Sequence, residues 1–205
     1  MNKGRVEAFS DGVLAVAITL LVLDLRVDVH SAEPLWAQLR LEWPTFAAYA
    51  VSFFFIGVIW LNHHSLFQLA ARVDRRLLVY NLLLLLFATA IPFTTSTYAD
   101  YVQDGGSNAR VAVIVYGAAM EGMAISFSLI LAHMLRAGLI EAALPPAESR
   151  KLLLRYGIGI AIYPLITLAA LVYAPLMLVL YALIVGYYLG PGLNQLSLDP
   201  AEGRR

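Results

Sequence analysis

Residues 6–27, VEAFSDGVLAVAITLLVLDLRV, decide the fold class of this chain. From residue 13 to residue 23 every side chain is apolar except Thr19. A helix that crosses a bilayer needs about 20 mostly apolar residues, so the stretch predicts a membrane-spanning helix, Val6–Val27. Because the apolar run continues beyond Ala15-Val16-Ala17, we interpret it as a retained helix and not as a cleaved signal peptide.

Five further stretches of similar length and composition follow along the chain. They are predicted at Thr45–Leu69, Leu77–Tyr98, Ala109–Met134, Leu152–Tyr173 and Pro175–Leu189. Six spans of about 20 residues leave only short loops in a chain of 205 residues. We therefore expect an all-α membrane protein with six transmembrane helices over residues 1–198, followed by a short cytoplasmic tail over residues 199–205.

The composition excludes several classes of protein. Hydrophobic residues make up 60% of the chain and charged residues 14%, whereas soluble proteins carry about 25% charged residues. The 14 basic and 14 acidic residues cancel, so no basic excess is available to bind nucleic acid. The absence of cysteine excludes thiolate metal sites, disulfides and cysteine nucleophiles.

The basic residues alternate between loops in the way that membrane topology requires. Only Arg26, Arg40 and Arg110, three of the 14 lysines and arginines, fall on the side opposite to the rest. The others precede the first predicted span, separate the second from the third and the fourth from the fifth, or end the chain. Because cytoplasmic loops collect lysine and arginine, both termini are predicted to be cytoplasmic.

Polar residues gather at one depth near the predicted cytoplasmic face. At 1.5 Å per residue, Asp11, His63 and Asn81 lie roughly 8–13 Å inside the first three spans. The full set is Arg5, Ser10, Asp11, Asn62, His63, His64 and Asn81. Such groups can satisfy one another, either as a structural network or as a gating or proton-sensing device. We predict no metal site, because adjacent histidines project about 100° apart on a helix.

The first predicted helix carries an apolar stripe. Its members Val16, Leu20 and Leu23, with Thr19 beside them, follow the spacing that places side chains on one helix face. In a membrane, lipid-facing and buried faces are both apolar, so the stripe alone is compatible with packing or with lining a pore.

Two motifs carry a resemblance to a known family. Arg5-x-x-x-Phe9-Ser10-Asp11 in the first predicted helix, and Trp60-Leu61-Asn62-His63-His64 near the end of the second, resemble the endolysosomal potassium channel family, transmembrane protein one-seven-five, and its bacterial members. The resemblance implies a homotetramer in a cell inner membrane, with four copies of the first helix around a central pathway for monovalent cations. It implies a passive potassium-permeable channel without enzyme activity or cofactors.

The resemblance also implies roles for individual residues. The implied pore constriction is Val16, Leu20 and Leu23, with Thr19 as a polar layer, and the implied motif and polar network are Arg5, Phe9, Ser10, Asp11, His63, His64 and Asn81. The family usually places isoleucine or leucine where this chain has Val16. Asp24 and Asp28 would attract cations to the outer mouth, or simply keep the helix end in water. Which histidine pairs with Asp11 stays open.

Glu121 supports an alternative hypothesis. It lies roughly 22 Å inside the fourth predicted span, where an unpaired carboxylate is costly. Either a hydroxyl of Tyr116, Tyr163 or Tyr173 satisfies it, or it is protonated. A proton-coupled secondary transporter that uses Glu121 or Asp11 as its proton site is therefore the second function that the sequence allows.

Overall fold

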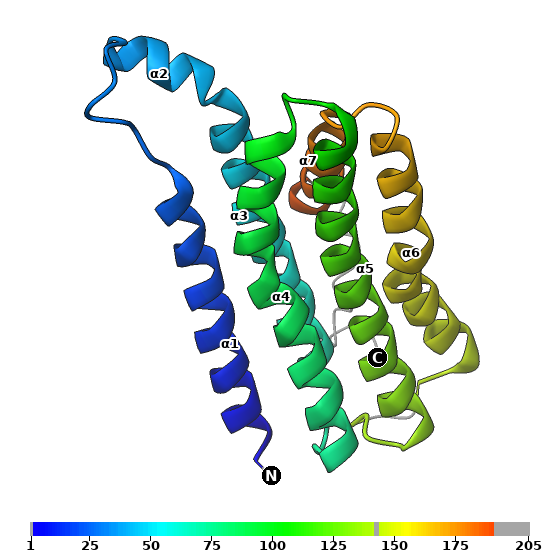
Figure 1. The fold of residues 1–205 in the computed structure, drawn as a ribbon. Coiled ribbons are helices and arrows are strands. Elements are labelled where there is room, and N and C mark those ends of the chain that lie inside the picture. Colours follow the sequence, from blue (N-terminus) through cyan, green and yellow to red (C-terminus); the bar gives the residue numbers. More distant parts are fainter. Residues whose placement is uncertain (1, 142–143, 191–205) are drawn as a thin grey trace.

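The computed structural model describes residues 2–141 and 144–190, and these fold as a helical bundle without a named strand. Figure 1 shows the long helices side by side, with α1 at one edge and α6 at the other. The helices are α1 (Lys3–Leu20), α2 (Leu35–Leu41), α3 (Trp43–Gln68), α4 (Arg75–Tyr101), α5 (Gly106–Arg136), α6 (Pro146–Ala170) and α7 (Leu176–Leu189), with a 3₁₀ turn after α1 (Leu21–Asp24). The predicted tail, residues 199–205, lies outside the described residues.

Five helical segments are long and apolar enough to cross a membrane. They are α1 with its 3₁₀ turn, α3, α4, α5 and α6. The predicted sixth span corresponds to α7, which has 14 residues and is shorter than the about 20 that a crossing needs. An all-helical membrane fold is therefore established, whereas the count of six crossings stays a prediction.

The helix boundaries correct the sequence prediction in three places. The first helix begins earlier than Val6, because the Asn2 side chain accepts a hydrogen bond from the Gly4 amide and caps the helix at Lys3. It also ends earlier, since the chain leaves helical geometry after Asp24. Helix α6 begins at Pro146, before the predicted start at Leu152, because proline is favoured in the first helical turn. Helix α2 was not predicted.

Helices α4 and α5 form the centre of the bundle. Helix α1 packs against α3 and α4, and α6 packs against α5 and α7. Two glycines of α5 permit close approach: a Cβ atom at Gly122 would collide with Phe87 of α4, and one at Gly117 would collide with Thr167 of α6. The two edge helices are thus attached to opposite sides of the same central pair.

The N-terminus and the α3–α4 and α5–α6 connections lie at one end of the bundle (Figure 1). The Ala71 amide donates to the Leu139 carbonyl at 2.7 Å, and the Glu141 amide donates to the Leu69 carbonyl at 3.1 Å. These bonds join the two connections. The N-terminus and the two connections predicted to be cytoplasmic therefore share one end of the described bundle, as a single membrane orientation requires.

Candidate ion pathway and polar network

Helix α1 has one buried face and one exposed face. The buried face packs against α3 and α4. It consists of Val6, Ser10, Leu14 and Ala17 and is continued by Leu21 in the 3₁₀ turn. On the other face Val16 is 58% exposed, Leu20 42% and Leu23 61%. Phe9 and Thr19 are exposed as well. Every position that the sequence assigned to the constriction therefore lies on the side of α1 that does not pack against its own bundle.

Thr19 lies between the first two apolar positions. Its hydroxyl donates a hydrogen bond to the Val16 carbonyl at 2.8 Å. The hydroxyl hydrogen is thereby directed at the backbone, which leaves the lone pairs of the oxygen free to accept. Leu23 lies in the 3₁₀ turn, three residues after Leu20, so the apolar stripe continues from α-helical into 3₁₀ geometry.

Three of the predicted polar residues form a directed hydrogen-bond chain. The Nε2 atom of His63 lies 2.9 Å from Oδ1 of Asn81, and Nδ2 of Asn81 donates to Oγ of Ser10 at 2.9 Å. The Ser10 hydroxyl then donates to the Val6 carbonyl at 2.9 Å. Because Asn81 Oδ1 can only accept, His63 carries its proton on Nε2. The chain connects α3, α4 and α1 in that order.

This polar chain is completely buried. Ser10, His63 and Asn81 are each no more than 1% exposed. The His63 ring stacks on Phe67 with the ring centroids 4.4 Å apart. Its Nδ1 atom is buried and finds no hydrogen-bond partner in the described part of the chain. Because burial in an apolar medium strengthens hydrogen bonds, the chain fixes the rotation of α1 about its own axis.

Asp11 and His64 belong to a second, more exposed group. The Trp60 indole donates to Oδ1 of Asp11 at 3.0 Å, and the Trp60 ring stacks on His64. His64 also lies 2.9 Å from the Gln68 amide nitrogen. Among the described residues Asp11 therefore bonds a tryptophan and neither histidine. Arg5 is exposed six residues before Asp11, nearly two helical turns nearer the N-terminus.

The outer acids differ in their surroundings. Asp28 shapes the loop after α1: its carboxylate accepts a hydrogen bond from the His30 amide at 2.9 Å, and its own amide donates to Gln38 at 3.0 Å. Asp24 ends the 3₁₀ turn and is partly exposed. Asp28 thus has a structural role in the loop, which the sequence did not indicate.

The bundle interior holds a polar cluster that sequence reasoning missed. The Ser52 hydroxyl lies 2.8 Å from that of Thr95 and 2.7 Å from that of Tyr116. Tyr116 is therefore engaged with α3 and does not satisfy Glu121, one of whose oxygens is buried without a partner among the described residues. The signal for this cluster was a hydroxyl residue in each of three spans, Ser52, Tyr116 and Thr95, the last within the run Thr94–Thr97 near the end of its span.

Comparison with known proteins identifies the family. A family model described as endosomal/lysosomal potassium channel TMEM175 matches residues 5–92. A Streptomyces collinus protein named as a potassium channel is 42% identical over 205 residues, which cover 98% of this chain and 98% of that protein. The chain belongs to the TMEM175 family. The human member, named endosomal/lysosomal proton channel TMEM175, is 36% identical over 128 residues, which cover 56% of this chain and 25% of the human protein.

A solved structure supports the same assignment. The crystal structure of a protein described as a lysosomal potassium-selective channel TMEM175 homologue from Chamaesiphon minutus matches with a TM-score of 0.81 and 32% identity. The match covers 95% of this chain and 98% of that chain. The TMEM175 family model spans the exposed face of α1 and the whole polar chain, whereas Glu121 lies beyond its last matched residue.

Proposed function

We propose that this protein is a potassium-permeable cation channel that conducts passively through a central pathway lined by four copies of α1. The proposal rests mainly on the two faces of α1. One face is anchored to the bundle through Ser10, while Val16, Leu20 and Leu23 are exposed on the other. The names of the Streptomyces and Chamaesiphon relatives as potassium channels support the same function.

In this arrangement the narrowest part of the pathway is apolar. Rings of Val16, Leu20 and Leu23 offer no oxygen atoms to replace the hydration shell of an ion, so they gate by dewetting and distinguish cations only modestly. The Thr19 oxygen, whose hydrogen is directed at Val16, offers lone pairs between the first two rings. Asp24 and Asp28 lie at the outer end and attract cations to the mouth.

The proposal includes an assembly of four copies and an orientation in the membrane. A single α1 cannot enclose a pathway, and a homotetramer is the assembly that the family resemblance implies. We infer a cell inner membrane location with both termini cytoplasmic, because the basic connections lie at the N-terminal end of the bundle (Figure 1). Mass measurement of the purified protein in detergent should give four copies per particle, and a monomeric particle would contradict this assembly.

Reconstitution into planar bilayers tests the function directly. With potassium on one side and sodium on the other, we expect discrete single-channel steps and a reversal potential displaced modestly toward the potassium equilibrium value. Replacing the anion should leave the reversal potential unchanged. Saturable flux without discrete steps, coupled to a proton gradient, would contradict a pore.

One observation favours a second candidate, a proton-coupled secondary transporter. Glu121 lies in the middle of α5 with one buried oxygen that has no partner in the described chain, and an unpaired carboxyl inside a membrane is a natural proton carrier. Glu121→Gln discriminates the two functions. A channel lined by α1 keeps its potassium conductance in this variant, whereas a transporter loses proton-coupled flux. Asp11→Asn provides the same test for the second possible proton site.

A further inference from the structure

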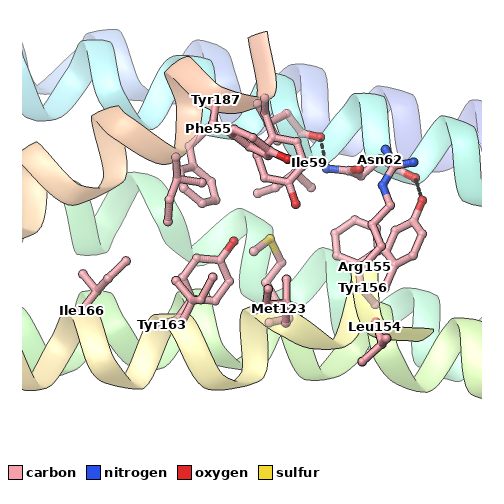
Figure 2. Close-up of a pocket in the computed structure, with 18 of the residues that line it drawn as sticks. Phe55, Ile59, Asn62, Met123, Leu154, Arg155, Tyr156, Tyr163, Ile166 and Tyr187 are labelled. Carbon is pink, nitrogen blue, oxygen red and sulfur yellow. Dashed lines mark hydrogen bonds between the residues drawn. The ribbon is translucent and has the colours of Figure 1, made fainter. Parts of the chain in front are cut away.

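A groove of about 1070 Å³ lies between α3, α5, α6 and α7, away from the candidate ion pathway. Figure 2 shows apolar side chains from these helices around it, among them Phe55 and Ile59 of α3 and Ile166 of α6. Pockets for small molecules measure about 300–1,000 Å³, so this groove is large enough for a long apolar ligand. Three of the four helices that line it are long and apolar enough to cross a membrane, so lipids of the bilayer are the ligands nearest to it.

One end of the groove is basic. Lys151 and Arg155 line it from one face of α6, and Glu148 lies one turn nearer the start of that helix. Figure 2 shows Arg155 at the same end as Asn62 and Tyr156, far from Ile166. Two cations and one carboxylate leave this end with an excess of one positive charge.

Arg155 is an unusual residue for its position. Nine residues separate it from the first residue of α6, which places it roughly 13 Å along the helix. Its guanidinium lies 5.8 Å from the centre of the Tyr156 ring, and within residues 2–141 and 144–190 it forms no salt bridge with a carboxylate. The ligand that suits both Arg155 and the apolar groove beside it combines a negative charge for the guanidinium with apolar chains for the groove.

We propose that this groove binds an anionic phospholipid, with the phosphate at Arg155 and Lys151 and the acyl chains along the apolar walls. Basic pockets between transmembrane helices on the cytoplasmic side are suited to anionic headgroups, and the apolar length of the groove excludes a free phosphate ion as its natural occupant. The groove is lined mainly by α6 and α7, and α6 forms the edge of the bundle opposite α1 (Figure 1). Its exposure to lipid rests on the proposed arrangement of α1 around a central axis.

Lipid retention measures this binding without any ion flux, so its failure is distinct from a failure of the channel proposal. The full chain is purified in detergent and analysed by native mass spectrometry after addition of phosphatidylglycerol or of phosphatidylcholine with the same acyl chains. We expect several-fold greater retention of phosphatidylglycerol. Arg155→Gln should reduce this to the level of phosphatidylcholine, while Arg150→Gln, an exposed arginine outside the groove, should not.

Two further variants separate the headgroup from the chains. Lys151→Gln should lower phosphatidylglycerol retention less than Arg155→Gln, because Lys151 lies one turn nearer the helix start. Ile162→Trp narrows the groove and should lower retention of both lipids. A melting temperature and helix content close to those of the original chain verify that each variant is folded.

Several outcomes would overturn the lipid site. Equal retention of the two lipids, or unchanged retention in Arg155→Gln, would mean that the groove does not recognise an anionic headgroup. Inorganic phosphate that raises the melting temperature as much as phosphatidylglycerol would assign the site to the free ion. A change in the number of copies per particle in Arg155→Gln would assign the groove to a neighbouring copy of the chain.

Discussion

Helices α1 and α6 form the two edges of the bundle, yet they are attached in different ways (Figure 1). Helix α1 is joined to its neighbours by the Ser10 and Asn81 hydrogen bond and by the contact of Asp11 with Trp60. Helix α6 is joined by close approach at Gly117 and by hydrogen bonds between segments such as Ser128 with the Tyr156 carbonyl. Both edges also pack through apolar side chains, but α1 is hydrogen-bonded through side-chain pairs, whereas the hydrogen bonds of α6 go to backbone carbonyls and are combined with close approach at a glycine.

The exposed faces of the two helices differ as well. Between Leu153 and Leu168 every exposed residue of α6 is apolar, which suits contact with lipid. The exposed face of α1 includes Thr19 within its apolar stripe and is followed by two acids. Apolar exposure alone therefore does not identify a pathway, whereas the position of the hydroxyl and of the charges distinguishes α1 from a lipid-facing helix.

The largest expected effect comes from overfilling the α5–α6 contact. Gly117→Ala places a methyl group against Thr167, and overpacking of this kind costs about 1–3 kcal/mol. Gly12→Ala is the matched change on α1, where an added Cβ meets no atom within 4 Å, so it should not destabilise the protein. Unfolding in detergent with increasing denaturant measures both, and equal midpoints for the two variants would show that α6 is not held by close fit.

The second effect tests the polar attachment of α1. Asn81→Ala removes the two side-chain hydrogen bonds that Asn81 makes in the buried chain and should cost about 1–2 kcal/mol, the range measured for hydrogen bonds between membrane helices in model peptides. Asn62→Ala is the control, because within the described residues that side chain bonds only the Val58 carbonyl of its own helix. If Asn62→Ala destabilises as much as Asn81→Ala, the network does not anchor α1.

The sequence predicted the features of the two edges and of the polar chain that depend on position along a helix. Apolar runs located all five long helices, and counting residues from the basic loops placed Ser10, His63 and Asn81 at one depth, where the structure brings them into contact. Depth does not determine the direction in which a side chain points. The partner of Asp11 was therefore missed: it is Trp60, one turn from His63 and His64 on the same helix.

Local backbone chemistry explains the other differences. Helix α6 begins at Pro146 and not at the predicted Leu152, because proline can stop one helix or begin the next and its neighbours decide which. The apolar run of the first span continues to Val27, but the helix ends at Leu20 and a 3₁₀ turn follows. Hydropathy reports the preference for lipid and carries no information on hydrogen-bond geometry.

A third prediction compares exposed residues of the two edges by conductance. In a tetramer Leu20→Ala shortens all four side chains of one apolar ring of α1. The wider ring should raise single-channel conductance by about twofold or more. Val16→Ala should act in the same direction if its ring contributes to the constriction. Leu165→Ala on α6 and Val179→Ala on α7 remove similar exposed side chains and should leave conductance unchanged. A uniform response of all four variants would argue that α1 packs like the other helices.

The smallest effect concerns the α4–α5 seam between the two edges. Asp74 caps α4, and its carboxylate also contacts the His133 imidazole of α5 at 2.8 Å. The Leu77 amide and, to a lesser extent, the His133 imidazole hold the pKa of Asp74 below its usual range. A lowered native pKa stabilises the fold above the unfolded value of about 3.9, and this stabilisation is lost as the pH falls through the native value.

Asp74→Asn isolates the charge of this residue, since asparagine caps a helix as well as aspartate does. At pH 7 the variant should be less stable by under about 1 kcal/mol, because the side chain is 40% exposed and solvent screens part of the lost charge. Below the native pKa both proteins are neutral at this position, so the difference in melting temperature should shrink as the pH falls below the unfolded value of about 3.9 toward the lower native pKa. A difference that does not shrink on acidification would mean that Asp74 acts through its shape and not through its charge. The contact between Asp74 and His133 belongs to α4 and α5 and to neither edge helix, so conductance and lipid retention of Asp74→Asn should stay unchanged at pH 7. This result would separate a general loss of stability from the specific effects expected at α1 and α6.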